Sequence, residues 1–168
     1  RQNGILFLCQ DMRSFELYGS VQAIVCYTDS LNHLTGSGDL TKCFALAANY
    51  LERGGLFIFD VNTPYKFENY YADNSFILED KGVYLGWQNA YNRKSGTVDF
   101  YITLFARQRG KTVYTRKDLC LRERRYSMKT LISALKKTGF CLCGVYADTD
   151  FGEIKDDTGR WFFIAKKL

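Results

Sequence analysis

Short, nearly unbroken runs of apolar residues set the strongest limit on how this chain can fold. Residues 5–9 (ILFLC), 21–26 (VQAIVC) and 56–60 (LFIFD) each read as a short strand, and a stripe of helically spaced apolar residues occupies 40–51. Continuous apolar strands suit a sheet that is covered on both faces. The order strand, loop, strand, helix, strand therefore predicts an open α/β sheet in this part of the chain.

The apolar positions of residues 40–51 follow the period of an amphipathic helix. Asp39 or Ser37 can cap its first turn, and Gly54-Gly55 can end it. We expect the helix to connect the second and third strands.

The pattern changes after this region to longer segments in which apolar and polar residues alternate. These segments cover residues 76–126, with turn sequences at 93–96 and 108–111. Alternation with intervening glycine-containing turns is typical of paired strands. The sequence predicts an antiparallel meander here.

A second helix and two strands are predicted to close the chain. Ser127 is a suitable N-cap, an apolar stripe follows it, and Gly139 can stop the helix. Residues 140–146 and 161–167 then have the composition of strands.

Length and composition restrict the class of protein. The chain has 168 residues, and 46% of them are hydrophobic, which is enough for one domain with a substantial core. No apolar run approaches the roughly 20 residues that cross a bilayer, and no signal-peptide layout is present, so we expect a cytoplasmic protein without a membrane partner. The six cysteines lack a CxxC pair, and we expect reduced, largely buried thiols and no metal site.

Basic residues are concentrated in one stretch. Between residues 107 and 137 there are eleven Lys or Arg and two acidic residues. Such a stretch can attract phosphate-bearing substrates, nucleotide-linked sugars or RNA. Because no RNA-binding motif accompanies it, we favour a solvated outer face and do not expect a nucleic-acid partner.

Four segments, in their order and spacing, resemble the small bacterial class I S-adenosylmethionine-dependent methyltransferases, including those related to amino-sugar N,N-dimethyltransferases. They are residues 9–15 (CQDMRSF), 29–34 (DSLNHL), 51–60 (LERGGLFIFD), and 123–126 (ERRY) leading to Leu135 and Gly139-Phe140. The resemblance implies S-adenosylmethionine as cofactor and an α/β, Rossmann-like methyltransferase sheet with an antiparallel β-meander insertion.

In the family a glycine-rich loop grips the cofactor, and in this chain it would precede Arg1. The resemblance therefore implies a core truncated at its N-terminus, in which the strands at residues 5 and 21 lack neighbours. We expect such a segment to rearrange, to exchange strands with a second copy as a homodimer, or to be one part of a longer chain. The implied division is residues 1–65 as the C-terminal part of the cofactor-binding core, 66–126 as the insertion that roofs the acceptor site, and 127–168 as the closing helix and strands.

The resemblance also assigns residues to the cofactor. Asp11 matches the acceptor for the adenine amino group, and Met12 matches the residue that covers the adenine ring; alternatively, Asp11 is only a turn residue. Tyr27, Asp29 and Asn32 match the loop beside the methionine part and the sulfonium, where strand ends also favour a ligand. Alternatively, Asp29 caps a turn and Asn32 only satisfies backbone groups.

Acceptor residues are implied in the same way. The sole histidine, His33, is a candidate catalytic base, although a packed or exposed histidine is the alternative. Trp87 and Tyr91 of the meander are candidates to line the acceptor pocket, although aromatic residues on strands often serve sheet packing. Arg124 and Tyr126 match a recurring Arg-x-Tyr element near the pocket, which implies either a substrate-binding or a structural role for them.

We therefore predict methyl transfer from S-adenosylmethionine to an amine or hydroxyl of a small molecule by in-line displacement, with this segment alone inactive. The alternative is a non-catalytic dimerising or binding module whose basic surface contacts an acidic partner or RNA. The first interpretation requires parallel strands near residues 5 and 21, with Asp11 and Asp29 at the same end of the sheet.

Overall fold

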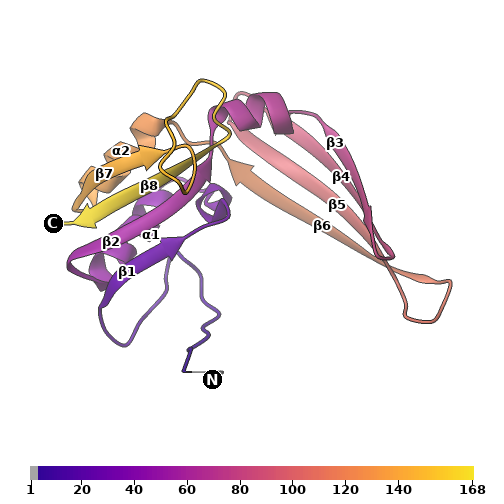
Figure 1. Cartoon of the computed structure of the whole chain (residues 1–168), viewed down its shortest axis with the longest axis horizontal. Helices are drawn as coiled ribbons and strands as arrows, with labels where there is room; N and C mark the ends of the chain where they lie inside the picture. Colours follow the sequence, from indigo (N-terminus) through magenta and orange to yellow (C-terminus); the bar gives the residue numbers. More distant parts are fainter. Residues whose placement is uncertain (1–3) are drawn as a thin grey trace.

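The computed structural model describes residues 4–168 and contains two four-stranded sheets (Figure 1). The first sheet has the order β1-β2-β8-β7, with β1 parallel to β2 and β8 antiparallel to both of its neighbours. Its strands are β1 (Val21–Cys26), β2 (Leu51–Asn62), β7 (Phe140–Tyr146) and β8 (Arg160–Lys167). This sheet is the α/β core that the apolar runs predicted.

Two helices, α1 (Asp39–Tyr50) and α2 (Met128–Lys137), cover one face of the core sheet. Phe44 of α1 packs edge-on against Phe57, with ring centroids 5.3 Å apart, and Phe59 stacks on Phe163 at 4.7 Å. These rings are almost fully buried. Burial of several large aromatic side chains, each contributing about 1.5–3 kcal/mol, is the main stabilising force here.

The opposite face of the core sheet carries no helix among residues 4–168. Val25 on this face is 55% exposed, and Leu56 is 36% exposed. Our expectation that the apolar strands are covered on both sides was wrong for the described residues, which provide helices for one face only.

The second sheet is the predicted antiparallel meander, which we call the wing because it projects away from the core (Figure 1). Its strands pair in sequence order: β3 (Ser75–Asp80), β4 (Val83–Asn92), β5 (Thr97–Arg107) and β6 (Tyr114–Arg124). Gly96 and Gly110 adopt positive φ angles of 68° and 74° in the two predicted turns. Glycine adopts this backbone conformation without the steric cost that a Cβ atom brings.

The wing has an apolar face and a polar face. Trp87, Ile102 and Leu119 lie opposite one another on adjacent strands and so share one face. The other face carries ion pairs such as Arg122–Asp99 and Arg116–Asp118. The apolar face is buried only near the core, by aromatic residues that follow β2.

Two short helices connect the sheets. The 3-10 helix η1 (Ser30–His33) follows β1 and lies against β2 and β6, and the π-helix η2 (Lys66–Tyr71) follows β2. π-helical turns are rare and are frequent at functional sites. Both elements lie at the junction of core and wing, where the candidate site is found.

Four local predictions were wrong. The N-cap of α1 is Gly38, without a side-chain hydrogen bond, instead of Asp39 or Ser37. Residue 5 forms only an isolated bridge, residues 6–10 form no strand, and Ile5–Leu8 are exposed. The helix α1 ends at Tyr50, and Gly54-Gly55 lie within β2 instead of ending the helix. All six cysteines are free, but only Cys43 is buried.

The N-cap of α2 is as predicted. The Ser127 hydroxyl accepts a hydrogen bond from the Thr130 backbone N–H at 3.1 Å. We expect Ser127→Ala to lower the free energy of unfolding by about 1 kcal/mol, since one backbone donor loses its partner. Urea denaturation measures this; Ser133→Ala, on the exposed side of α2, should stay within about 0.5 kcal/mol, and equal effects of the two changes would contradict the capping role.

Candidate functional site

The carboxyl ends of β1 and β2 lie side by side, and the chain after β1 turns sharply there. Thr28 and Asp29 both have positive φ angles, 57° and 54°, which are uncommon for residues other than glycine. Their backbone N–H groups donate to the Asp60 carboxylate at 3.2 and 2.7 Å. A strained turn of this kind persists only where surrounding contacts hold it, and Asp60 supplies them.

Arg160, at the start of β8, joins this turn to β2. One guanidinium nitrogen donates to Asp60 Oδ2 at 2.5 Å, and another donates to Asp29 Oδ1 at 3.1 Å. Asp60 is only 2% exposed. The single guanidinium therefore balances two carboxylates, of which Asp60 is almost completely removed from water.

Asn62 extends the network from the core to the wing. Its Nδ2 lies 2.9 Å from Asp29 Oδ2, 3.1 Å from the Tyr71 hydroxyl and 3.1 Å from Glu123 Oε2, and its Oδ1 accepts from Lys66 Nζ at 3.0 Å. Tyr71 and Lys66 belong to η2, and Glu123 belongs to β6. One amide thus connects β2, the strained turn, η2 and the wing. We call these residues, with Asp60 and Arg160, the junction network.

Glu123 is the buried acid of this network, 3% exposed. Burial, followed by repulsion from Asp29, raises the pKa of Glu123 to about 8. Burial also lowers the pKa of the nearby Lys66 ammonium. A neutral Glu123 is the form that this site favours near pH 7.

His33 lies beside Glu123 at the edge of the network. Its Nε2 is 3.8 Å from Glu123 Oε1, and its Nδ1 is 3.1 Å from the Arg122 carbonyl oxygen. A carbonyl oxygen only accepts, so this contact is a hydrogen bond when Nδ1 carries the proton. In that tautomer the lone pair of Nε2 is free, and the side chain is 41% exposed.

Asn32 and Tyr126 are buried and hydrogen bonded to backbone groups. Asn32 accepts from the Asn62 N–H and donates to the Arg124 carbonyl, both at 2.9 Å, and it has no exposed surface. The Tyr126 hydroxyl donates to the Leu34 carbonyl. In this structure both side chains hold the loop after β1 in place rather than presenting free groups to a ligand.

Arg124 and Tyr27 differ from these because each keeps part of its surface accessible. Arg124 donates to the Thr35 carbonyl at 2.8 Å. Tyr27 is 42% exposed and packs edge-on against Phe162 on the uncovered face of the sheet.

Asp11 and Met12 lie outside the junction network. Arg13 binds the Asp11 carboxylate through its backbone N–H and guanidinium, and these hydrogen bonds lower the pKa of Asp11 to about 2. Arg13 also contacts Asp39 at 3.3 Å, at the first residue of α1. Met12 packs against the main core.

The contact between Arg13 and Asp39 shows where the segment with Asp11 and Met12 lies relative to the core sheet. α1 connects two parallel strands, so its first residue lies beyond the carboxyl end of β1. The N-terminal segment passes the tip of β1 in Figure 1. Asp11 and Asp29 therefore lie at the same end of the sheet, although residues 6–10 form no strand.

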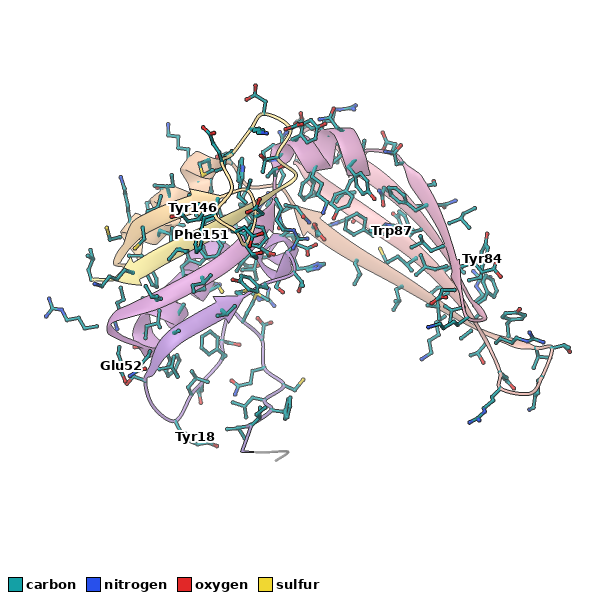
Figure 2. The ribbon with its side chains drawn as sticks, in the orientation of Figure 1. Tyr18, Glu52, Tyr84, Trp87, Tyr146 and Phe151 are labelled. Carbon is teal, nitrogen blue, oxygen red and sulfur yellow. The ribbon has the colours of Figure 1, made fainter. Side chains whose placement is uncertain are left out.

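Trp87 and Tyr91 belong to an aromatic cluster with Phe67, Tyr71 and Phe100. Figure 2 shows Trp87 on the wing. Three buried polar atoms among the described residues have no hydrogen-bond partner: Trp87 Nε1, Asn89 Oδ1 and Tyr91 Oη. The three residues alternate along β4 and so share its apolar face. Unpaired buried polar atoms are costly, and these three have almost no accessible surface in this structure.

Sequence reasoning missed most of the junction network. Asp60 and Asn62 follow the apolar residues of β2, and polar residues at that position are a usable signal. Arg160 and Glu123 gave no such signal, because they meet Asp60 and Asn62 only through folding. Within residues 4–168, no helix is long and apolar enough to span a membrane, and no group of three or more His, Cys, Asp or Glu is placed to hold a metal ion.

Comparison with known proteins gives a consistent result. No family model matches the chain. "Putative methyltransferase YqeM" of Bacillus subtilis (strain 168) is 30% identical over 164 residues, covering 97% of this chain and 66% of the relative. "Putative methyltransferase GWCH70_2453" of Geobacillus sp. (strain WCH70) is 28% identical over 168 residues, covering 99% of this chain and 67% of the relative.

A solved structure agrees in fold. A S-adenosylmethionine-dependent methyltransferase from Clostridium acetobutylicum ATCC 824 is 29% identical, with a TM-score of 0.88 over 95% of this chain and 63% of that chain. The chain thus spans about two thirds of the length of the relatives that it matches.

Proposed function

We propose a function that starts from the family of this chain, which belongs to the class I S-adenosylmethionine-dependent methyltransferases. In this proposal the complete protein transfers the methyl group of S-adenosylmethionine to an amine or hydroxyl of a small molecule. The supporting observation is the convergence of Asp11, Asp29 and the wing at the carboxyl ends of β1 and β2. Ligands of open α/β sheets bind at this end of the strands. The activity is proposed for the complete protein because the chain covers about two thirds of its relatives.

The residues near Asp11 are chemically suited to adenine. Asp11 Oδ2 accepts one hydrogen bond, from Arg13, and the side chain is 43% exposed, so it keeps capacity to accept from an amino group. Met12, half-buried against the core, offers an apolar surface for the ring. S-adenosylmethionine, when bound, supplies an electrophilic methyl group on a sulfonium.

The junction network has a positioning role in this proposal. Asp60 and Arg160 hold the strained turn so that Tyr27 and Asp29 border the reacting groups. Asn32 supports the same turn through Asn62. Holding two reactants in line and away from water lowers the barrier without a covalent intermediate.

Acceptor binding is proposed at the junction of wing and core. Trp87 and Tyr91 belong to the aromatic cluster of the wing, and aromatic faces of this kind are suited to an amine. His33 Nε2 is suited to take a proton from the attacking amine or hydroxyl. Arg124 and Tyr126 have an indirect role: they donate hydrogen bonds to the Thr35 and Leu34 carbonyl oxygens and so hold this loop beside the proposed acceptor site.

Calorimetric titration of the full-length protein with S-adenosylhomocysteine tests the proposal. We expect saturable binding that weakens about tenfold in Asp11→Ala, because the adenine amino group loses a charged acceptor. Asp150→Ala, at an exposed position of the loop before β8, is the matched control and should bind as the unmodified protein does.

Two outcomes would count against this account. Absence of binding by the full-length protein would refute the methyltransferase proposal and favour the non-catalytic module. Binding that is equally strong in Asp11→Ala would refute the role of Asp11 alone.

A further inference from the structure

A groove of about 430 Å³ lies between the start of α1 and the outer side of α2. One wall is formed by Gly36, Ser37, Gly38, Leu40 and Thr41, and α2 with the preceding segment contributes the other. No residue of the junction network lines it. The groove is therefore distinct from the junction network. It adjoins the proposed acceptor site through Arg124 and Tyr126, which line the groove and bind the Thr35 and Leu34 carbonyl oxygens.

Three cationic side chains line the groove: Arg124, Lys129 and Lys137. Lys129, Ser133 and Lys137 are spaced four residues apart on α2, so they form one row along the helix, about 12 Å from first to last. The groove lining contains no acidic residue; the neighbouring Asp39 is buried and its carboxylate accepts from Arg13 and from the Gly36 N–H. Among residues 4–168, neither lysine forms an ion pair.

Hydroxyl groups accompany these cations. Ser37, Thr41, Thr130 and Ser133 also line the groove. Two adjoining hollows share lining residues with the groove and add Arg125 and Lys136, again without an acidic residue. Arg125 is paired with Glu68, but Lys136 has no such partner in the described part of the chain. Across the residues that the structure describes, the three lysines of α2 that line these hollows, Lys129, Lys136 and Lys137, thus form no ion pair.

We propose that this groove binds a small phosphate-bearing molecule, with Arg124, Lys129 and Lys137 contacting the phosphate oxygens. A guanidinium fits phosphate oxygens with paired donors, and lysines add point charges. Serine and threonine hydroxyls supply neutral donors to the remaining oxygens. The groove volume matches sites for ligands of nucleotide size, and the cation row ends within about two helical turns, which favours a small molecule over a long RNA strand.

Titration of the 168-residue chain with ADP and with pyrophosphate tests this proposal directly. We expect saturable binding of both probes that weakens when salt rises from about 50 to 200 mM. The double variant Lys129→Gln/Lys137→Gln should bind both probes at least about tenfold more weakly, since two charged donors are lost. The matched control is Lys94→Gln/Lys155→Gln, which removes the same charge at two exposed positions elsewhere and should change affinity less than about twofold.

Three results would overturn the proposal: no saturable binding of either probe, equal weakening in the two double variants, or tighter binding of a single-stranded RNA oligonucleotide than of ADP through Lys129 and Lys137. The readout is independent of methyl transfer. Loss of S-adenosylhomocysteine binding by the full-length protein, with ADP binding retained, would refute the proposed function and leave this site intact.

Discussion

Replacing Asp60 with alanine is expected to lower the free energy of unfolding by about 3–5 kcal/mol, because it leaves a partly buried guanidinium without its closest partner. Asp60 accepts from the Thr28 and Asp29 N–H groups and from Arg160, and it is almost fully buried. The same change releases the strained turn after β1. Urea denaturation of the 168-residue chain measures the effect.

A double-mutant cycle separates this pairing from a general effect of the substitution. Arg160→Ala alone should also be strongly destabilising, and the two changes together should cost less than their sum, since neither charge is then left unpaired. Asp157→Ala, on the exposed loop before β8, should stay within about 0.5 kcal/mol. Additive effects of Asp60→Ala and Arg160→Ala would contradict the proposed coupling.

Glu123→Gln is expected to change how stability depends on pH. The pKa of Glu123 is raised from 4.5 to about 8 in the folded protein, so the folded state keeps a proton that the unfolded chain releases. The stabilisation from this group is complete below pH 4.5 and is lost as pH rises toward 8. Glutamine does not titrate, and its amide oxygen can still accept from Asn62.

The difference between the two proteins gives the test. From about pH 5 to pH 9 the stability of Glu123→Gln relative to the unmodified chain should rise by a few kcal/mol, because a pKa unit corresponds to about 1.4 kcal/mol. Glu153→Gln, at an exposed position, should follow the unmodified chain at every pH. Parallel pH curves for Glu123→Gln and the unmodified chain would show that Glu123 has no raised pKa.

The junction network also explains how the wing is held relative to the core. Asn62 is part of β2, and its amide contacts Tyr71 of η2 and Glu123 of β6. Asn32 links the same strand to the end of β6 through the Arg124 carbonyl. Groups that border the proposed acceptor space thus come from both sheets, joined by buried hydrogen bonds that are costly to break.

Features of the fold that depend on a few neighbouring residues could be predicted from the sequence. The meander, its turns at Gly96 and Gly110, and the Ser127 cap of α2 were all predicted, because alternation, positive φ and capping act over a few residues. The prediction of a strand at residues 5–9 was wrong, because an apolar run becomes a strand only when another strand lies beside it. The neighbouring sequence provides no such strand.

The candidate site was harder to predict for the same reason. Asp29 was found through the resemblance, but its partner Arg160 lies 131 positions away, and Glu123 meets Asn62 across 61 positions. Hydrogen bonding of Asn32 to backbone groups was one of two interpretations of the sequence, but its complete burial depends on how η1 packs against β2 and β6. Long-range pairing of polar side chains is a property of the fold.

A crystal structure of the full-length protein with S-adenosylhomocysteine tests the central claim most directly. The account predicts the nucleoside at the carboxyl end of β1, with the adenine amino group on Asp11, the ring against Met12 and the sulfur toward the turn at Asp29. A ligand bound at the opposite end of the strands, or one that contacts neither Asp11 nor the turn after β1, would contradict it.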